Sequence, residues 1–489
     1  MTFGTPSEIA IVTDLALKVQ TASSPSHVLA LADEALRKLP NQTKARGLVQ
    51  LARAEVFHRT RGALEAQAVV EEAVRLLPDD SKPLMLAAYI FTYSEQPERA
   101  VDYYLRAGLI DQEQLRSIES YDVEALFRRL RFKDLGKAKI ARLSARLIEV
   151  GWSGNDFSTR SSMVQRLISY RLENEDESGA RALVSELVNP ADMYWLLGRK
   201  EAAPVWKDIE AWGGAQLEKQ WPIYLKELQD RWRVDPAGHN TVDYLGALRS
   251  AKYFVTISQS IQPVLATKLS VSEMAQLLRF LSTISDAYSR SESTALIGPL
   301  FEKFAKSFPL EESANALNVP IGHAQYLLST GRTGEALAKI NLALAASSEW
   351  GAEVNGDAIA GMHRIRVCAL AEEGRAAEAE ALQRFVIERG VREAYNAATV
   401  HLCLGHIDDA EKALIDFANY PDRSANVLGM LREAGRPDLV TPYTSRQAAF
   451  WRLLAKRPEF SAAASKTDRL LPFRLPDGAP PEAALRKAQ

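Results

Sequence analysis

The 489-residue sequence predicts an all-α protein, arranged as an α-solenoid of antiparallel helix pairs with an irregular helical middle section. Three observations support this fold class. Two short helices and the turn between them can be identified in full from Ser81 to Gly108, and the same spacing of small and bulky residues recurs towards both ends of the chain. The one run with β-forming composition, Tyr253 to Ile261, has no partner strand and is therefore predicted to be helical.

The stretch from Ser81 to Gly108 predicts one complete helical hairpin. A polar turn separates the two helices and ends at Pro97, where a helix can begin. A single hairpin cannot bury its own apolar face, so it needs stacked copies on either side. The apolar residues that define the two faces are Leu84, Ala87, Ala88 and Phe91 in the first helix, and Ala100, Tyr104 and Ala107 in the second.

Residues 1–110 are predicted to hold the N-terminal repeats. Ala35, Ala73 and Ala107 occupy equivalent positions, at spacings of 38 and then 34 residues. Residues 111–310 form the predicted irregular middle section, because apolar residues still recur three and four apart while the longer register is lost.

Residues 311–465 are predicted to hold the C-terminal repeats and a closing helix, which includes Gln447 to Leu454. In each repeat a glycine ends the first helix and an acidic residue lies in the first turn of the next. Residues 466–489 contain four prolines after Leu471 and few apolar residues, so we expect a flexible tail. The glycine and acid pairs are Gly331 with Glu335, Gly374 with Glu378, and Gly405 with Asp409.

This pattern resembles the tetratricopeptide repeat (TPR), a unit of about 34 residues made of two antiparallel helices. The resemblance implies a right-handed superhelix whose first helices line a groove for a peptide or a protein segment. It also implies a non-catalytic scaffold or adaptor that binds another protein. The groove residues implied at matching positions are Glu55, His58, Arg59, Lys82, Tyr89, Tyr93, Gln325, Ser329, Arg392, Tyr395 and Thr399.

One departure from the family narrows the choice of partner. Chaperone-binding members clamp a terminal carboxylate with a lysine and an asparagine on consecutive first helices. Here the corresponding positions hold Leu51, Glu55, Met85 and Tyr89, so a chaperone tail is not the expected ligand.

The charge balance excludes a general attraction to polyanions. Lysine and arginine number 60 against 62 acidic residues, so we expect neither nucleic acid nor an anionic membrane as the partner. The two cysteines, Cys368 and Cys403, argue against a disulfide-built extracellular fold. Together with an N-terminus unlike a signal peptide and the lack of a membrane-span pattern, they predict a cytoplasmic protein.

The stretch from 128 to 146 contains eight basic residues and one acid, which predicts a positive stripe on helices. Such a stripe would bind phosphate, an acidic partner or nucleic acid. The alternative is a solvated face balanced by acids on neighbouring helices, such as Glu173 to Glu177. The basic residues are Arg128, Arg129, Arg131, Lys133, Lys137, Lys139, Arg142 and Arg146.

A tryptophan-rich stretch holds five of the eight tryptophans between positions 195 and 232. Aromatic walls bind sugars, bases and apolar peptides, so the stretch is a candidate pocket. The alternative is packing at an irregular junction. The five are Trp195, Trp206, Trp212, Trp221 and Trp232.

His401, Cys403 and His406 are candidate metal ligands, with Cys368 as a fourth. On one continuous helix the second and third would point about 200° and about 140° away from the first. They would then not converge, so the sequence predicts no metal site, and no cofactor is expected.

No catalytic pattern accompanies the repeats, since phosphate-binding loops, dinucleotide fingerprints and nucleophile elbows are absent from the sequence. An interaction scaffold is therefore the leading hypothesis. One alternative is a ligand-sensing or regulatory arm of a bacterial signalling system. A further one is an (α/α) toroid enzyme that acts on a saccharide in the tryptophan-rich stretch.

Overall fold

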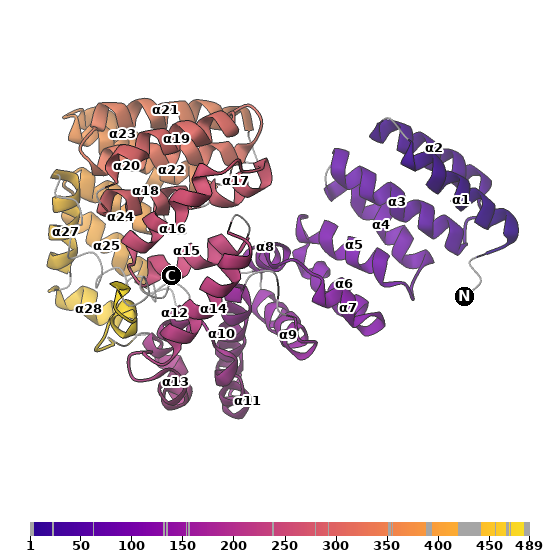
Figure 1. Cartoon of the computed structure of the whole chain (residues 1–489), viewed down its shortest axis with the longest axis horizontal. Helices are drawn as coiled ribbons and strands as arrows, with labels where there is room; N and C mark the ends of the chain where they lie inside the picture. Colours follow the sequence, from indigo (N-terminus) through magenta and orange to yellow (C-terminus); the bar gives the residue numbers. More distant parts are fainter. Residues whose placement is uncertain are drawn as a thin grey trace. The chain divides into compact units, whose positions relative to one another are not determined.

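The chain was analysed as a computed structural model. It describes residues 4–483 except 22–23, 62, 131–132, 134, 153, 155–156, 237–238, 279, 292, 351–353, 355, 388–393, 419–441, 455, 466–468 and 470. Within these residues every regular element is an α-helix or a short 3₁₀ helix (Figure 1), so the predicted all-α fold is confirmed. The chain divides into two compact units, Met1–Glu186 (unit 1) and Leu187–Gln489 (unit 2), and this boundary falls inside the predicted middle section.

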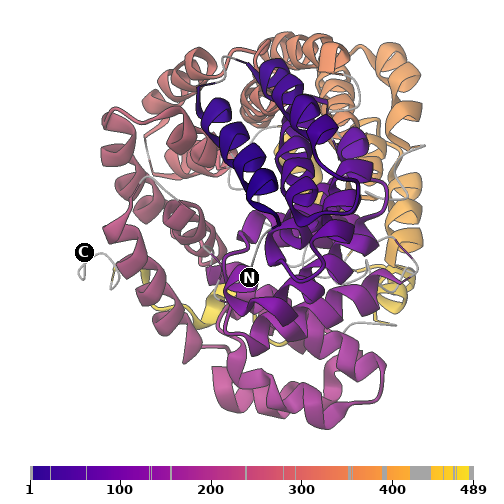
Figure 2. The same ribbon diagram turned by 90° about the vertical axis from the view of Figure 1, so that its right-hand side faces the viewer.

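Unit 1 is a series of helices in which consecutive members pack as antiparallel pairs. The first helices of successive pairs also touch one another, so α1, α3, α5 and α8 form one row (the first-helix row of unit 1), as Figure 2 lets the reader follow from the indigo end. The helices are α1 (Pro6–Gln20), α2 (Pro25–Lys38), α3 (Lys44–Arg61), α4 (Ala63–Leu76), α5 (Ser81–Thr92), α6 (Pro97–Ile110), α7 (Gln112–Arg116), α8 (Ser120–Leu130), α9 (Gly136–Glu149), α10 (Phe157–Glu173) and α11 (Glu177–Ala182).

The α5–α6 hairpin shows why the local sequence folds this way. The Asp80 side chain accepts a hydrogen bond from the backbone N–H of Lys82 and caps α5, and Pro97 starts α6. All seven residues predicted to define the apolar faces are buried, with Ala88 and Ala100 at 0% exposure. Alanines at the contact let the two helices approach closely, as the repeat pattern predicts.

Unit 2 continues the helix pairing. The second helix of its first pair begins irregularly, because Pro204 lies in a 3₁₀ helix that precedes it rather than in the α-helix itself. The β-forming run from Tyr253 lies in a helix, as predicted. The elements up to the C-terminal repeats are α12 (Pro190–Gly198), η2 (Lys200–Val205), α13 (Trp206–Gly213), α14 (Gln220–Val234), α15 (His239–Ser250), α16 (Phe254–Ala266), α17 (Val271–Leu278), α18 (Leu281–Arg290) and α19 (Ile297–Ser307).

The C-terminal repeats follow the predicted glycine pattern. Gly331, Gly374 and Gly405 each have a positive φ, at 78°, 76° and 81°, which favours glycine and ends a first helix. The predicted pairing of consecutive helices is confirmed here, because each helix packs on the next. The helices are α20 (Asn318–Ser329), α21 (Thr333–Trp350), α22 (Gly356–Glu372), α23 (Ala376–Ile387), α24 (Ala394–Cys403) and α25 (Ile407–Ala418).

The closing helix is longer than the stretch that predicted it. Helix α27 (Pro442–Leu454) packs against α20 and α24, and α28 (Pro458–Ala464) packs against α25. Phe450, Trp451, Leu454 and Phe460 bury themselves against the last repeat and complete its core. The terminal hairpin is thereby shielded on its open side.

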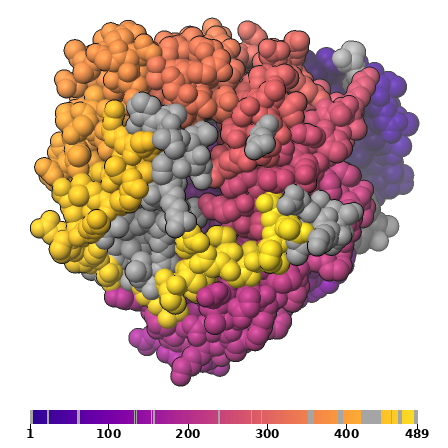
Figure 3. Space-filling view, turned by 60° about the vertical axis from the view of Figure 1, so that its left-hand side comes forward, coloured from indigo at the N-terminus to yellow at the C-terminus, as the bar shows by residue number. Residues whose placement is uncertain are grey.

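Part of the stretch 466–489, which was expected to form a flexible tail, lies against unit 2; we call its described residues between 469 and 483 the C-terminal segment. Leu471 and Phe473 are each only 5% exposed, and the yellow segment runs over the magenta helices of unit 2 in Figure 3. Its described residues are mostly non-helical, apart from η6 (Leu475–Gly478) and two helical residues at 482–483. Its apolar side chains and several of its carbonyl groups contact the helices of unit 2.

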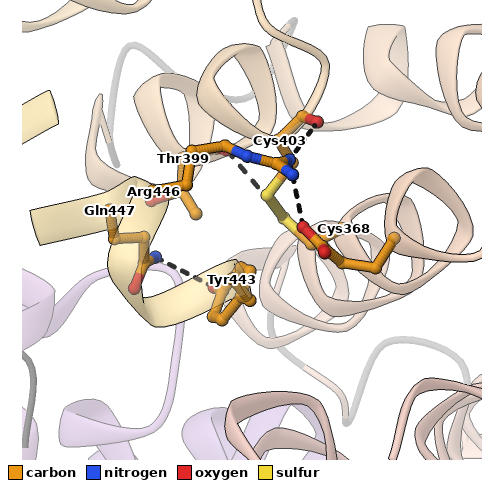
Figure 4. Close-up of a disulfide and its surroundings, with 7 residues drawn as sticks. Cys368, Thr399, Cys403, Tyr443, Arg446 and Gln447 are labelled. Atoms are coloured by element: carbon orange, nitrogen blue, oxygen red, sulfur yellow. Dashed lines mark hydrogen bonds and ion pairs between the residues drawn. A yellow bond between two sulfur atoms is a disulfide. The ribbon is translucent and has the colours of Figure 1, made fainter. Parts of the chain in front are cut away.

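The two cysteines form a disulfide between α22 and α24, with Cα atoms 5.1 Å apart (Figure 4). Adjacent first helices of two repeats bring Cys368 and Cys403 together although 35 residues separate them. Since disulfides persist mainly in oxidising compartments, the cysteines no longer support the predicted cytoplasmic location. In the described part of the chain, no helix combines the length and apolarity needed to cross a bilayer.

Candidate interaction surfaces

The predicted groove residues of unit 1 lie along its first-helix row. The His58 ring from α3 meets the Tyr89 ring from α5 edge-on, with centroids 5.0 Å apart, and Tyr89 meets Tyr93 at 5.2 Å. The Tyr93 hydroxyl then donates a hydrogen bond of 2.7 Å to Asp122 Oδ1 on α8. These four half-buried side chains form one continuous line across three helices, which we call the aromatic line.

Electrostatics keep the polar end of the aromatic line in one hydrogen-bonded state. Burial and the hydrogen bond to Asp122 raise the pKa of the Tyr93 hydroxyl well above its usual value. Burial also raises the pKa of the Asp122 carboxyl, although the bond from Tyr93 opposes that shift. At neutral pH the Tyr93 hydroxyl therefore keeps its proton and donates it in the hydrogen bond to Asp122. The Arg129 guanidinium lies 5.8 Å from the Tyr93 ring centroid and adds a positive charge there.

The other predicted residues of this groove are charged. Lys82 lies exposed at the start of α5, and Glu55 lies exposed on α3. The backbone of Arg59 belongs to α3, but its side chain lies outside the described residues. The row therefore offers exposed charges of both signs beside a partly apolar, aromatic line.

The described side chains of the basic stretch have polar partners within the chain. Each of its seven described members contacts an acid or a backbone carbonyl; for example, Lys139 Nζ lies 2.6 Å from Asp102 and Lys137 Nζ lies 3.1 Å from Glu173. Arg131 lies outside the described residues. The remaining pairings are Arg128 with Glu124, Arg142 with Asp102, Arg146 with Glu149, Arg129 with the Ser94 carbonyl, and Lys133 with the Glu95 carbonyl.

The C-terminal half of the predicted groove is partly covered by the chain itself. Gln325 is exposed on α20, and Tyr395 is 36% exposed on α24, where the buried Arg364 lies 5.6 Å from its ring centroid. Arg392 falls outside the described residues. Helix α27 lies against α20 and α24, and its Arg446 pairs with Glu372 at 3.0 Å and donates to the Cys403 carbonyl (Figure 4).

The tryptophan-rich stretch contacts the C-terminal segment. The Trp221 indole N–H donates to the Leu475 carbonyl at 3.0 Å, and the Tyr194 ring meets the Phe473 ring edge-on at 5.6 Å. The Arg469 guanidinium lies 3.6 Å from the Trp206 ring centroid. Part of the aromatic surface considered as a pocket is thus occupied by residues from the same chain.

Backbone hydrogen bonds hold the same segment further along unit 2. The Arg469 N–H donates to the Gly198 carbonyl at 2.7 Å, and the Thr256 N–H donates to Glu482 Oε1 at 2.7 Å. The Tyr253 hydroxyl donates to the Pro480 carbonyl. Other tryptophans are used for internal packing: Trp212 donates to the Leu187 carbonyl and Trp232 stacks on Tyr244 at 5.2 Å.

The corner between α24 and α25 brings the side chains of His401, His406 and Asp409 close together. The prediction that His401 and His406 diverge assumed one continuous helix, but α24 ends at Cys403 and Gly405 reverses the chain. Ligand atoms of His401, His406 and Asp409 lie within 4.8 Å of one another. Burial is the main cause that lowers the pKa of His401, with Asp409 opposing the shift.

Sequence reasoning missed Asp122, Arg364 and the occupancy of the tryptophan-rich stretch. Asp122 lies in the region where the repeat register is lost, and Arg364 lies in a helix interior that predicts only a solvated cation. The segment that contacts the tryptophans follows them by more than 200 residues, so spacing carries no signal for it.

Known proteins give limited guidance. No protein-family model matches the chain, and no curated protein sequence matches it. Among solved structures, Naa15/Naa10 bound to HypK-THB matches at 12% identity and TM-score 0.27 over 99% of this chain and 80% of that one. The TPR domain of P58(IPK) matches at 11% identity and TM-score 0.22, over 92% of this chain and 100% of that one. The APC/C hetero-tetramer Cut9-Hcn1 matches at 13% identity and TM-score 0.21, over 94% of this chain and 95% of that one.

Proposed function

We propose that this protein is a non-catalytic interaction scaffold whose first-helix row in unit 1 binds a segment of another protein along the aromatic line. The observation that carries the proposal is the chain's own C-terminal segment. Unit 2 holds that segment through one indole donor, ring contacts and backbone hydrogen bonds, and these are the kinds of contact by which proteins recognise peptides.

Unit 1 offers comparable groups at a half-buried surface. His58, Tyr89 and Tyr93 supply ring faces and edges, while Lys82 and Glu55 supply exposed charges beside them. Aromatic side chains contribute large contact area at low entropic cost, which suits a surface that binds a peptide. The pairing of the described basic side chains supports a protein partner over nucleic acid. A cytoplasmic location stays a prediction from the sequence.

Site-specific photo-cross-linking in cells tests the proposal. A photoreactive residue at Lys82, on the first-helix row, is compared with one at Leu64, which is 72% exposed on the second helix α4. We expect the same protein partner to be captured at position 82 in high yield and not at position 64.

Two substitutions provide the control for the surface chemistry. His58→Ala and Tyr89→Ala should each reduce capture at position 82 while far-ultraviolet circular dichroism stays unchanged. Equal capture at positions 82 and 64, or capture unaffected by both substitutions, contradicts the proposed surface.

A further inference from the structure

The corner between α24 and α25 differs from two otherwise equivalent corners of the same chain. At each corner a residue in the last turn of the first helix accepts a hydrogen bond from the backbone N–H five residues later: Leu327 from Arg332 at 2.8 Å, Leu370 from Arg375 at 2.9 Å, and His401 from His406 at 2.8 Å. This is the bond of a Schellman motif, and it places the two residues beside each other. An acid follows three residues on in every case.

The first two corners use these positions for structure. Arg332 pairs with Glu335 through two nitrogens at 2.7 and 2.6 Å, and Arg375 pairs with Glu378 at the same two distances. Leu327 and Leu370, whose carbonyls accept the corner hydrogen bond, are buried in the repeat core. Leucine, arginine and glutamate thus form an apolar contact and an ion pair.

The third corner replaces these three residues by His401, His406 and Asp409, all of which can coordinate a metal ion. One ligand atom from each lies within 4.8 Å of the others. A tetrahedral ion with bonds of about 2.1 Å needs separations of about 3.4 Å. Asp409 is exposed and His406 is partly exposed, so side-chain rotation can close the remaining distance.

His401 supplies a second observation. Its Nδ1 atom is buried and has no hydrogen-bond partner, whereas buried polar atoms in folded proteins are almost always paired. An ion held on the imidazole would account for a polar ring at a position where the other two repeats have a leucine. Within the described residues, no other group of three such side chains comes as close together.

We propose that His401, His406 and Asp409 bind a divalent transition-metal ion, with Zn²⁺ as the first candidate. Two imidazole nitrogens and one carboxylate oxygen suit such ions better than Mg²⁺ or Ca²⁺, which prefer oxygen ligands. Three protein ligands leave at least one coordination position for water or for a donor from another molecule. The nearby thiols take no part, because Cys368 and Cys403 are joined in a disulfide.

Two neighbouring acidic residues, Asp408 and Glu411, are less suitable than Asp409 as the carboxylate ligand. Arg457 pairs with Asp408 at 3.2 Å and with Glu411, so both carboxylates already contact a cation. The proposed set therefore consists of one residue from α24, one from the turn and one from the first turn of α25. This geometry depends on the tight corner at Gly405.

Metal titration of the full chain tests the proposal. The protein is stripped with a chelator, kept without reductant so that the disulfide persists, and titrated with Co²⁺, which is then displaced by Zn²⁺. We expect one Co²⁺ per chain, with a ligand-field absorption spectrum that Zn²⁺ abolishes.

The chain itself supplies the matched variant. The double substitution His406→Arg with Asp409→Glu installs the ion pair of the other two corners, so the fold should persist while metal affinity falls at least about tenfold. His401→Leu, which installs the leucine of those corners, serves as an independent variant. His27→Ala removes an exposed histidine in unit 1 and should leave the titration unchanged.

Each result decides the proposal. Loss of the Co²⁺ spectrum in either corner variant, with retention in His27→Ala, supports it. Failure of the unmodified protein to bind Co²⁺ or Zn²⁺, or equal binding by all variants, overturns it.

Discussion

At the residue scale, small side chains at helix contacts decide how closely the pairs approach. Ala88 on α5 and Ala100 on α6 are completely buried and belong to the same core cluster. The larger residues Leu84 and Phe91 belong to that cluster too and are buried to the same degree. The sequence predicts where small and large residues are buried, because both kinds recur at fixed positions in the repeat.

Ala88→Leu should therefore destabilise unit 1. Extra methylene groups in a close-packed contact cost about 1–3 kcal/mol, so we expect a lower urea midpoint. Ala10→Leu, at an exposed position of α1, is the control and should change stability by less than about 0.5 kcal/mol. If the two substitutions have equal effects, the hairpin contact is not as close as described.

His323 makes stability depend on pH. Its ring stacks on Phe301 with centroids 4.3 Å apart, and burial, helped by Lys339 and Arg332, lowers its pKa to about 4. The unfolded chain has a histidine pKa near 6.5 and takes up the proton first, so folded-state stability falls as pH decreases from about 6.5 to about 4.

The substitution His323→Phe keeps an aromatic ring and removes the titrating group. We expect its thermal midpoint, relative to the unmodified protein, to rise as the pH is lowered from 7 to 4. His27→Phe, at an exposed position, should show no such trend. A constant difference between His323→Phe and the unmodified protein across this range would contradict the assignment.

At the element scale, the helix pairs are locally encoded but the C-terminal segment is not. Capping residues, prolines and glycines set the helix ends, as Asp80 and Pro97 do in the α5–α6 hairpin. The C-terminal segment looked mobile because it is proline-rich. Its position follows from the tertiary structure, in which Trp221 contacts Leu475 and Tyr194 contacts Phe473.

Removal of residues 469–489 should expose the tryptophan-rich stretch. Trp206 loses the Arg469 guanidinium and Trp221 loses its carbonyl acceptor, so we expect red-shifted tryptophan fluorescence and stronger acrylamide quenching. Removal of residues 484–489 alone keeps these contacts and is the matched control. Identical fluorescence in both truncated proteins would show that the segment does not cover the tryptophans in solution.

At the scale of the whole molecule, two units with their own cores share one chain. One buried cluster of unit 1 extends from Ala54 to Met163, and one in the C-terminal repeats extends from Leu317 to Tyr443. Compact units with separate cores can unfold separately. The disulfide joins only helices of unit 2.

Calorimetry should consequently resolve two unfolding transitions. Ala88→Leu should lower the midpoint temperature of the unit 1 transition only. Reduction of the disulfide should lower the midpoint temperature of the unit 2 transition only. The corresponding loss in the free energy of unfolding is about 2–4 kcal/mol, as expected for a bridge of this loop length. The double substitution Cys368→Ala with Cys403→Ala should reproduce the reduced protein and respond to no reductant. A single transition that moves in both experiments would contradict independent units.

The sequence by itself determined the fold class, the helix pairs and the positions of His58, Tyr89 and Tyr93 on first helices, because these depend on short-range periodicity and capping. Contacts between distant segments were decided only by the tertiary structure. The disulfide, the covered tryptophans and the cluster of His401, His406 and Asp409 arise because helices and turns fold back on one another. Residue spacing along a chain specifies one face of one helix, but it does not specify which other face, or which segment, will lie against it.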